Sequence, residues 1–210
     1  MTNNKNKLIV SIINESFEKI IHITSVYKKI ELRLKQLSLT NEQIISIINI
    51  SELVVITDIT ELDVTHNFHK INFNAKQIEK IIIDCPIEKI ENKNIIKYIN
   101  DTVIKKILSY HQWLHTEKIE NIFPNLLEKI GTNINKYFII KIAVLVENSD
   151  EEYTLFSIFN NYPDFNFILI PLGKKFQKAR IKSLELGSKY MFCYVSNPVT
   201  DCQLHYEEYL

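Results

Sequence analysis

Two short apolar runs separated by a helical segment decide the fold of this chain: Tyr137-Phe-Ile-Ile-Lys-Ile-Ala-Val-Leu-Val146, Asp150 to Phe159, and Phe165-Asn-Phe-Ile-Leu-Ile-Pro-Leu172. Both runs are rich in β-branched residues and apolar at almost every position, as strands buried on both faces of a parallel sheet are. The segment between them starts with polar residues and then carries apolar residues at helical spacing. The pattern predicts a strand, a helix and a second strand, which is the repeating unit of parallel sheets.

The same alternation continues along the rest of the chain. Six further runs are predicted to be strands: Lys7 to Ile13, Lys28 to Leu34, Leu53 to Ile59, Lys80 to Ile87, Val103 to Tyr110 and Lys189 to Ser196. Helices are predicted at Ser16 to Ile23, Asn41 to Ile48 (capped by Thr40), Ala75 to Ile78, Lys93 to Ile99, Thr116 to Ile130 and Lys178 to Leu186. Because eight strands alternating with helices close into a barrel, residues 1–210 are predicted to form a single (β/α)8 TIM barrel with a short C-terminal end. An open doubly wound sheet is the alternative.

The net charge and the residues that could bind a metal restrict the possible classes of function. The 25 basic and 25 acidic residues leave no net field that would attract nucleic acid or an anionic membrane. Cys85, Cys193 and Cys202 lack the close spacing of a zinc or redox site, and His66 and His69 have no third ligand nearby, so no metal is expected. The apolar run near the amino terminus is too short for a signal peptide or a membrane span. The chain is expected to be cytoplasmic, with a small molecule as its partner.

The two arginines of the chain are a further indication. Of the 25 basic residues, only Arg33 and Arg180 are arginine, in a sequence dense in Ile, Asn and Lys. Such a composition replaces arginine by lysine wherever a point charge is enough. The two arginines therefore indicate places where a planar, two-pronged guanidinium is needed, although chance retention is the alternative for each.

A barrel of this class carries its chemistry at the carboxyl ends of its strands. Lys141 lies there within an apolar run, and burial lowers the pKa of a lysine, which leaves neutral amine able to attack a carbonyl and form an imine. His111 follows the fifth predicted strand and could shuttle protons near neutral pH. Each has a structural alternative, since Lys141 could snorkel at the rim and His111 could cap a strand.

Five motifs in order along the chain give a more specific indication. They are Glu31-Leu-Arg33, Ser109-Tyr-His111, Lys141-Ile-Ala143, Gly173-Lys-Lys-Phe-Gln-Lys-Ala-Arg180, and Gln203 near the C-terminus. In their order and approximate spacing they resemble the type I 3-dehydroquinate dehydratases of the shikimate pathway, across nearly the whole chain.

The resemblance implies a cofactor-free lyase that converts 3-dehydroquinate to 3-dehydroshikimate in aromatic amino acid biosynthesis. It implies that Lys141 forms a Schiff base with the substrate ketone, and that His111 helps to form and hydrolyse the imine and moves the C2 proton. It implies a lid at residues 173–180, and family analogy adds a homodimer. The implied substrate-binding residues are a carboxylate clamp, Arg180, and three residues that hold hydroxyls and shape the pocket: Glu31, Arg33 and Gln203.

The chain departs from the family pattern at several positions. Asp58 stands where the family has a second carboxylate-binding arginine, and Lys35 replaces an aspartate that supports the arginine of strand two. Val199, next to Thr200, replaces a small hydroxyl residue, and Glu61 is the match for an acidic residue that orients the histidine. These departures leave two alternatives open: another class I Schiff-base lyase or aldolase barrel, and a catalytically weakened barrel remnant.

Overall fold

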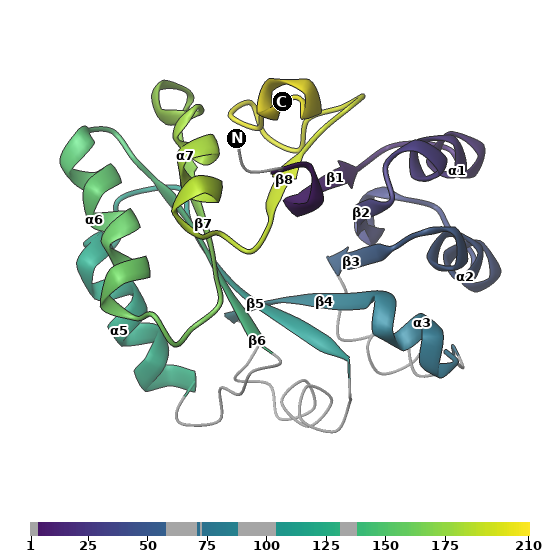
Figure 1. Cartoon of the computed structure of the whole chain (residues 1–210), viewed down its shortest axis with the longest axis horizontal. Coiled ribbons are helices and arrows are strands. Elements are labelled where there is room, and N and C mark those ends of the chain that lie inside the picture. Colours follow the sequence, from purple (N-terminus) through teal and green to yellow (C-terminus); the bar gives the residue numbers. More distant parts are fainter. Residues whose placement is uncertain (1–3, 58–70, 72, 88–103, 131–137) are drawn as a thin grey trace.

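A barrel of eight parallel strands surrounded by helices forms the molecule, as seen in the computed structural model, which describes residues 4–57, 71, 73–87, 104–130 and 138–210 (Figure 1). The strands are β1 (Leu8–Ile12), β2 (Lys29–Arg33), β3 (Leu53–Thr57), β4 (Ile81–Pro86), β5 (Lys105–Gln112), β6 (Phe138–Leu145), β7 (Phe167–Leu172) and β8 (Met191–Cys193). The α-helices are α1 (Phe17–Val26), α2 (Asn41–Ile50), α3 (Ala75–Lys80), α5 (Ile119–Ile130), α6 (Ser149–Asn161) and α7 (Ala179–Leu186). Short 3-10 helices are η1 (Asn4–Lys7), η2 (Leu34–Gln36), η7 (Lys174–Phe176) and η8 (Tyr206–Tyr209).

Strand pairing confirms the predicted fold class. The order is β7-β6-β5-β4-β3-β2-β1-β8, and every ladder between these strands is parallel. The two edge strands are brought together by the segment that precedes β8, where Lys189 N–H donates to Phe167 O at 2.8 Å. Ser188 Oγ accepts from Leu169 N–H at 3.0 Å at the same seam. The barrel is thus nearly closed, and the doubly wound alternative is wrong.

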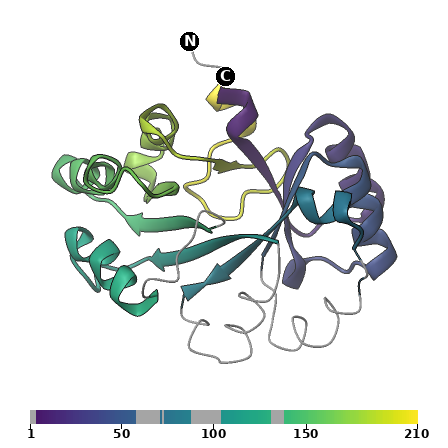
Figure 2. The ribbon, with the colours of Figure 1, turned by 60° about the horizontal axis from the view of Figure 1, so that its bottom comes forward.

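The helices lie in two groups on the outside of the strands. Figure 1 shows α1, α2 and α3 on one side and α5, α6 and α7 on the opposite side. In the tilted view of Figure 2 the strands run between these two groups. Within the described part of the chain, no helix combines the length and the apolar character that crossing a membrane requires.

The starts of α2 and α5 have identifiable local causes. Thr40 and Gln43 form a capping box at the start of α2, as expected for the predicted cap. The helix predicted at Thr116 to Ile130 is confirmed, but its predicted start is wrong, because α5 begins only at Ile119. Residues before it are held in a turn, in which Gln112 Nε2 donates to the carbonyl oxygen of Glu117 at 2.8 Å. The predicted helix at residues 93–99 lies outside the described residues.

The strands are buried on both faces, as their apolar runs predict. Every residue of β1, β3 and β7 is buried, and seven of the eight residues of β6 are buried. A few charged residues lie among these buried positions, notably Glu31, Asp84 and Lys141. Charges in such a core must be paired or serve a function.

Candidate active site

A cavity of about 230 Å³ lies at the carboxyl ends of the strands and contains all six residues selected from the sequence. It is lined by Ser11, Glu31, Arg33, Pro86, His111, Trp113, Lys141, Ala143, Ile170, Leu172, Arg180, Phe192, Val199, Thr200 and Gln203. The sequence-derived candidates come from β2, β5, β6, α7 and the segment after β8. The structure therefore brings together residues that are up to 172 positions apart, from Glu31 to Gln203.

Strand alternation explains how two of these residues enter the cavity. Glu31 and Arg33 are two positions apart on β2, so their side chains leave the same face of the strand. His111 lies on β5, and its strand partner on β6 is Ala143, two residues beyond Lys141. The prediction that His111 follows its strand is wrong in detail, because His111 lies within β5.

Lys141 forms a buried ion pair with Asp84. The distance from Lys141 Nζ to Asp84 Oδ2 is 2.7 Å, and the two side chains are only 9% and 4% exposed. The same Nζ lies 4.6 Å from the centroid of the Phe192 ring. Lys141 is thus buried, as its apolar strand run predicts, but its ammonium group donates a hydrogen bond to a carboxylate that the run did not indicate.

Asp84 is the site residue that sequence reasoning missed. It occupies the middle of Ile81-Ile-Ile-Asp-Cys-Pro86, the run that forms β4. An acidic residue in such a run is as unexpected as a lysine in β6. The signal that selected Lys141 would also have selected Asp84.

Glu31 is a second buried carboxyl group in this part of the barrel. Burial raises the pKa of Glu31 above its usual value, and the positive charges of Lys141 and Arg33 only partly oppose that effect. Ser11, which also lines the cavity, is a hydrogen-bond partner that acts in the same opposing direction. The net effect is a raised pKa, so this carboxyl group holds its proton more strongly than an exposed glutamate does.

Arg180 and Gln203 are held by other parts of the protein. Arg180 is buried, and it donates from Nε to Pro171 O at 3.3 Å and from Nη2 to Cys202 Sγ at 3.4 Å. Gln203 donates from Nε2 to Ser11 Oγ at 3.0 Å and accepts from Val199 N–H at 2.8 Å. Gln203 thus fixes the loop that follows β8 against β1, while the fork of Arg180 is oriented by its two acceptors.

Trp113 is an exposed aromatic residue that lines the cavity, a position that the sequence did not indicate. Trp113 follows β5 directly, lines the cavity and is 52% exposed. Val199 and Thr200 line the same cavity. Val199 has no hydroxyl group, but the hydroxyl residue Thr200 is the next residue along the chain.

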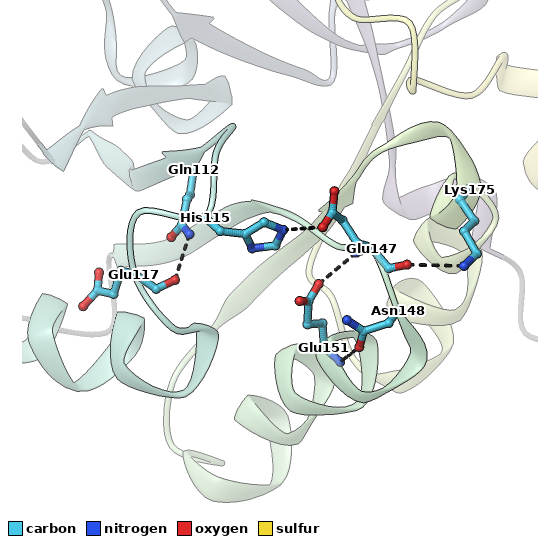
Figure 3. A network of polar contacts seen from close by, with 7 residues as sticks. All are labelled: Gln112, His115, Glu117, Glu147, Asn148, Glu151 and Lys175. Atoms are coloured by element: carbon cyan, nitrogen blue, oxygen red, sulfur yellow. Dashed lines mark hydrogen bonds and ion pairs between the residues drawn. The ribbon is translucent and has the colours of Figure 1, made fainter.

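Polar contacts join the loops around the mouth (Figure 3). His115, after β5, lies with Nε2 3.1 Å from Glu147 Oε2, after β6. The carbonyl oxygen of Glu147 accepts from Lys175 Nζ at 3.3 Å, in the segment after β7. Lys174 in turn forms an ion pair of 3.3 Å with Asp201, after β8. The predicted lid, residues 173–180, is thus tied to its neighbours on both sides.

The remaining sequence-derived candidates concern residues that the structure does not describe or does not bring together. Asp58, Glu61, His66 and His69 lie outside the described residues. Among the residues that are described, no group of three or more His, Cys, Asp or Glu side chains is arranged to hold a metal ion. None of the cysteines in the described part of the chain forms a disulfide, and all of them are buried.

Fold and cavity define a class of protein: a (β/α)8 barrel with a buried lysine, a histidine and two arginines around one cavity at the carboxyl ends of its strands. No protein-family model matches the sequence. A 3-dehydroquinate dehydratase of Archaeoglobus fulgidus is 26% identical over 102 residues, which is 49% of this chain and 48% of that protein. The match thus spans about half the length of the relative.

Solved structures extend the likeness to nearly the whole chain. The 3-dehydroquinate dehydratase of Aquifex aeolicus superposes with a TM-score of 0.74 at 17% identity, covering 96% of this chain and 94% of that one. The type I 3-dehydroquinate dehydratase of Clostridium difficile, solved with covalently modified comenic acid, gives a TM-score of 0.71 at 18% identity, covering 97% and 89%. The resemblance noted in the sequence is confirmed at the level of the fold: the chain has the fold of the type I 3-dehydroquinate dehydratases.

Proposed function

We propose that this protein is a type I 3-dehydroquinate dehydratase, which removes water from 3-dehydroquinate to give 3-dehydroshikimate in the biosynthesis of aromatic amino acids. The observation that carries the proposal is that Lys141 and His111 line one cavity at the carboxyl ends of the barrel strands. The relatives of the same fold carry this activity in their names, and one of them was solved with a covalently modified ligand. A cytoplasmic location goes with this proposal.

Lys141 is the proposed nucleophile. Its neutral amine attacks the C3 ketone, and loss of water from the adduct gives an iminium ion. The positive nitrogen withdraws electrons from the adjacent carbon, so a proton at C2 becomes acidic. Its removal leaves an enamine, in which the electron pair of the broken C–H bond is delocalised onto the nitrogen.

His111 is the proposed general base and acid. It takes the C2 proton, and the enamine then expels the C1 hydroxyl, which receives a proton from the imidazolium and leaves as water. Hydrolysis of the remaining imine releases 3-dehydroshikimate and regenerates the lysine. No cofactor is required by this sequence of steps.

The other four candidates are proposed to bind the substrate. Arg180 has further N–H groups beside those that bond Pro171 and Cys202, and these are proposed to bind the ring carboxylate. Glu31 and Arg33, which lie on β2, are proposed to bind hydroxyl groups of the substrate. Gln203 contributes by holding the loop after β8, since both ends of its amide are bonded within the protein.

Borohydride trapping tests this proposal. We expect the protein to convert 3-dehydroquinate to a product with enone absorbance, and borohydride added during turnover to attach one ligand mass to the peptide that contains Lys141. Lys106→Met is the matched control, because Lys106 is a second buried lysine that does not line the cavity. Trapping should survive in this control and disappear in Lys141→Ala.

Two outcomes would contradict the proposal. Turnover without trapping, or with trapping at another lysine, would exclude the imine at Lys141. A folded protein that neither turns over nor is trapped would favour a weakened barrel remnant.

A further inference from the structure

The ion pair between Asp84 and Lys141 crosses the interior of the barrel from β4 to β6. At 2.7 Å between Lys141 Nζ and Asp84 Oδ2, the two groups are in direct hydrogen-bonding contact. Both side chains are more than nine-tenths buried. Lys141 Nζ, the atom that must become a nucleophile, is therefore already hydrogen-bonded to the carboxylate of Asp84, which can accept its proton.

Asp84 uses only part of its hydrogen-bonding capacity. Its second oxygen, Oδ1, is buried and has no hydrogen-bond partner among the described residues. The same is true of the hydroxyl of Ser109, whose strand partner on β6 is Lys141 itself. A buried carboxylate that is incompletely satisfied is costly, so a purely structural role would leave this arrangement without a benefit.

The other charged groups around Lys141 do not offer the same contact. Glu31 on β2 is the second carboxyl group nearby, and burial raises its pKa above the usual value, whereas the hydrogen bond of Lys141 Nζ goes to Asp84. Arg33, His111 and Arg180 line the same cavity from β2, β5 and α7, and the first and last are cations. Asp84 is thus the anion that faces Lys141 in the described part of the barrel.

We propose that Asp84 is a catalytic residue of the imine step, which accepts the ammonium proton of Lys141 and returns it to the departing oxygen. This inference rests on the proposed function for its substrate. The proton passes from Nζ to Oδ2, and the freed lone pair of Nζ forms the bond to the carbonyl carbon while the C=O π electrons move to oxygen. The oxygen then leaves as water with two protons, the one held by Asp84 and a second that comes from the nitrogen.

After water has left, the same carboxylate serves a second purpose. The nitrogen is now an iminium ion that carries one proton and one positive charge, and Asp84 is again an anion. An opposite charge at this distance stabilises the cationic nitrogen. The electron sink for deprotonation at C2 therefore keeps its charge in a buried site.

The first experiment measures how Asp84 affects the protonation of Lys141, without the proposed substrate. Reductive methylation with formaldehyde and cyanoborohydride modifies only neutral amines, and peptide mass spectrometry reports its extent at Lys141 as a function of pH. Asp84→Asn keeps the shape and an acceptor oxygen but cannot take a proton. We expect its half-maximal modification to move to lower pH by about one unit or more, as for loss of an opposite charge.

Asp164→Asn is the matched control for this measurement. Asp164 is exposed and lies before β7, at the opposite end of that strand from the cavity. Its methylation profile at Lys141 should equal that of the wild type. An unchanged profile in Asp84→Asn would overturn the proposal, because Asp84 would then have no effect on the proton of Lys141.

The second experiment measures turnover of 3-dehydroquinate by the same variants. Asp84→Asn should lose roughly 100-fold or more in kcat, the effect of a lost general acid–base group, although its lysine is more easily methylated. Asp84→Glu retains a base and should recover part of that loss. A purely structural role predicts that methylation and turnover fall together, so a parallel fall would overturn the proposal, as would normal turnover in Asp84→Asn.

The methylation and turnover experiments distinguish failure of this inference from failure of the proposed function on which it rests. If the wild type does not turn over 3-dehydroquinate, the proposed function fails, yet the methylation profiles still show whether Asp84 controls the protonation of Lys141. Circular dichroism of each variant establishes that it is folded. If Asp84→Asn does not fold, Asp84→Glu decides, since a methylation profile identical to the wild type together with a full loss of turnover would contradict proton transfer.

Discussion

At the scale of single residues, the pair of Lys141 and Asp84 links stability to chemistry. Removing one partner of a buried ion pair leaves an uncompensated charge and costs about 3–5 kcal/mol. We expect Lys141→Ala to lose about that much unfolding free energy in urea denaturation, because the buried Asp84, 4% exposed, would lose its ion-pair partner. The double variant Lys141→Met, Asp84→Leu should be more stable than Lys141→Ala. A double variant that is less stable would show that the pair is not coupled.

Arg180 gives a prediction about the geometry of substrate binding. Lysine cannot reproduce the fork that donates from Nε to Pro171 O and from Nη2 to Cys202 Sγ. Arg180→Lys should therefore weaken the reacting complex by about 1–3 kcal/mol, as expected for lost charge-assisted hydrogen bonds, which appears as a lower kcat/KM. Wild-type kinetics in this variant would mean that Arg180 is an arginine by chance.

Glu31 gives a prediction about pH. Because burial raises the pKa of Glu31 in the folded protein, its contribution to stability is fully present below the ordinary pKa of a glutamate and is lost as pH rises through the raised value. Glu31→Gln cannot ionise, so its unfolding free energy should exceed that of the wild type by a margin that grows from pH 4 to pH 8. Thermal or urea unfolding at several pH values measures this margin. A margin that does not change with pH would contradict the raised pKa of Glu31.

Sequence reasoning found the lysine but not its partner, and the reason is physical. Lys141 was selected because a cation in an apolar strand is unusual, and an aspartate in β4 is unusual in the same way. The register that brings β4 and β6 to face each other across the barrel is a tertiary property, however, and spacing along the chain does not contain it. Residue type could have indicated Asp84, but only the fold shows that its oxygen lies 2.7 Å from Nζ.

At the scale of elements, Gly173 controls the start of the segment after β7. Its φ is +100°, and a Cβ atom there would lie 3.2 Å from Val146 O. Gly173→Ala should cost about 1–3 kcal/mol of unfolding free energy through backbone strain, and it should also raise KM because the displaced segment leads to Arg180. Differential scanning calorimetry and steady-state kinetics measure the two effects.

Gly187 is the matched control for this prediction. It also has a positive φ, +134°, but a Cβ atom there would meet only ordinary contacts, the nearest at 3.7 Å. Gly187→Ala should thus lose stability with little change in KM. If the two variants raise KM equally, the segment after Gly173 has no special part in binding.

Elements were easier to predict than their ends. The strand runs were identified because strands buried on both faces need apolar, β-branched residues throughout, and β1, β3 and β7 fulfil that pattern. The start of α5 was predicted three residues too early, because hydrogen bonds such as the one from Gln112 to Glu117 compete with the helix and leave no trace in hydrophobic spacing.

At the scale of the whole molecule, closure of the barrel depends on a small group of buried hydroxyls between β7 and the segment before β8. Ser188 Oγ accepts from Leu169 N–H at 3.0 Å and lies 2.7 Å from Ser183 Oγ, which donates to Leu169 O at 2.6 Å. Ser188→Ala would leave a buried N–H without its acceptor, which costs about 1–3 kcal/mol. We expect a lower unfolding free energy and faster hydrogen exchange at Leu169.

Ser25→Ala is the control for barrel closure, because Ser25 is exposed and, among the described residues, bonds only within its own helix, to His22 O. This change should leave hydrogen exchange at Leu169 unaltered. Equal exchange in Ser188→Ala and Ser25→Ala would show that the seam is closed by other contacts, such as the bond from Lys189 N–H to Phe167 O.

The position of Trp113 has an optical consequence. The chain contains one tryptophan, and it lines the mouth of the cavity while remaining 52% exposed. Indole fluorescence depends on the polarity of its surroundings, and every photon of tryptophan emission from this protein therefore originates beside the cavity. A molecule that enters would replace water around the indole and change the colour or intensity of that emission. The protein thus carries an intrinsic fluorophore with which occupancy of the cavity can be followed in real time, without an attached dye and without turnover.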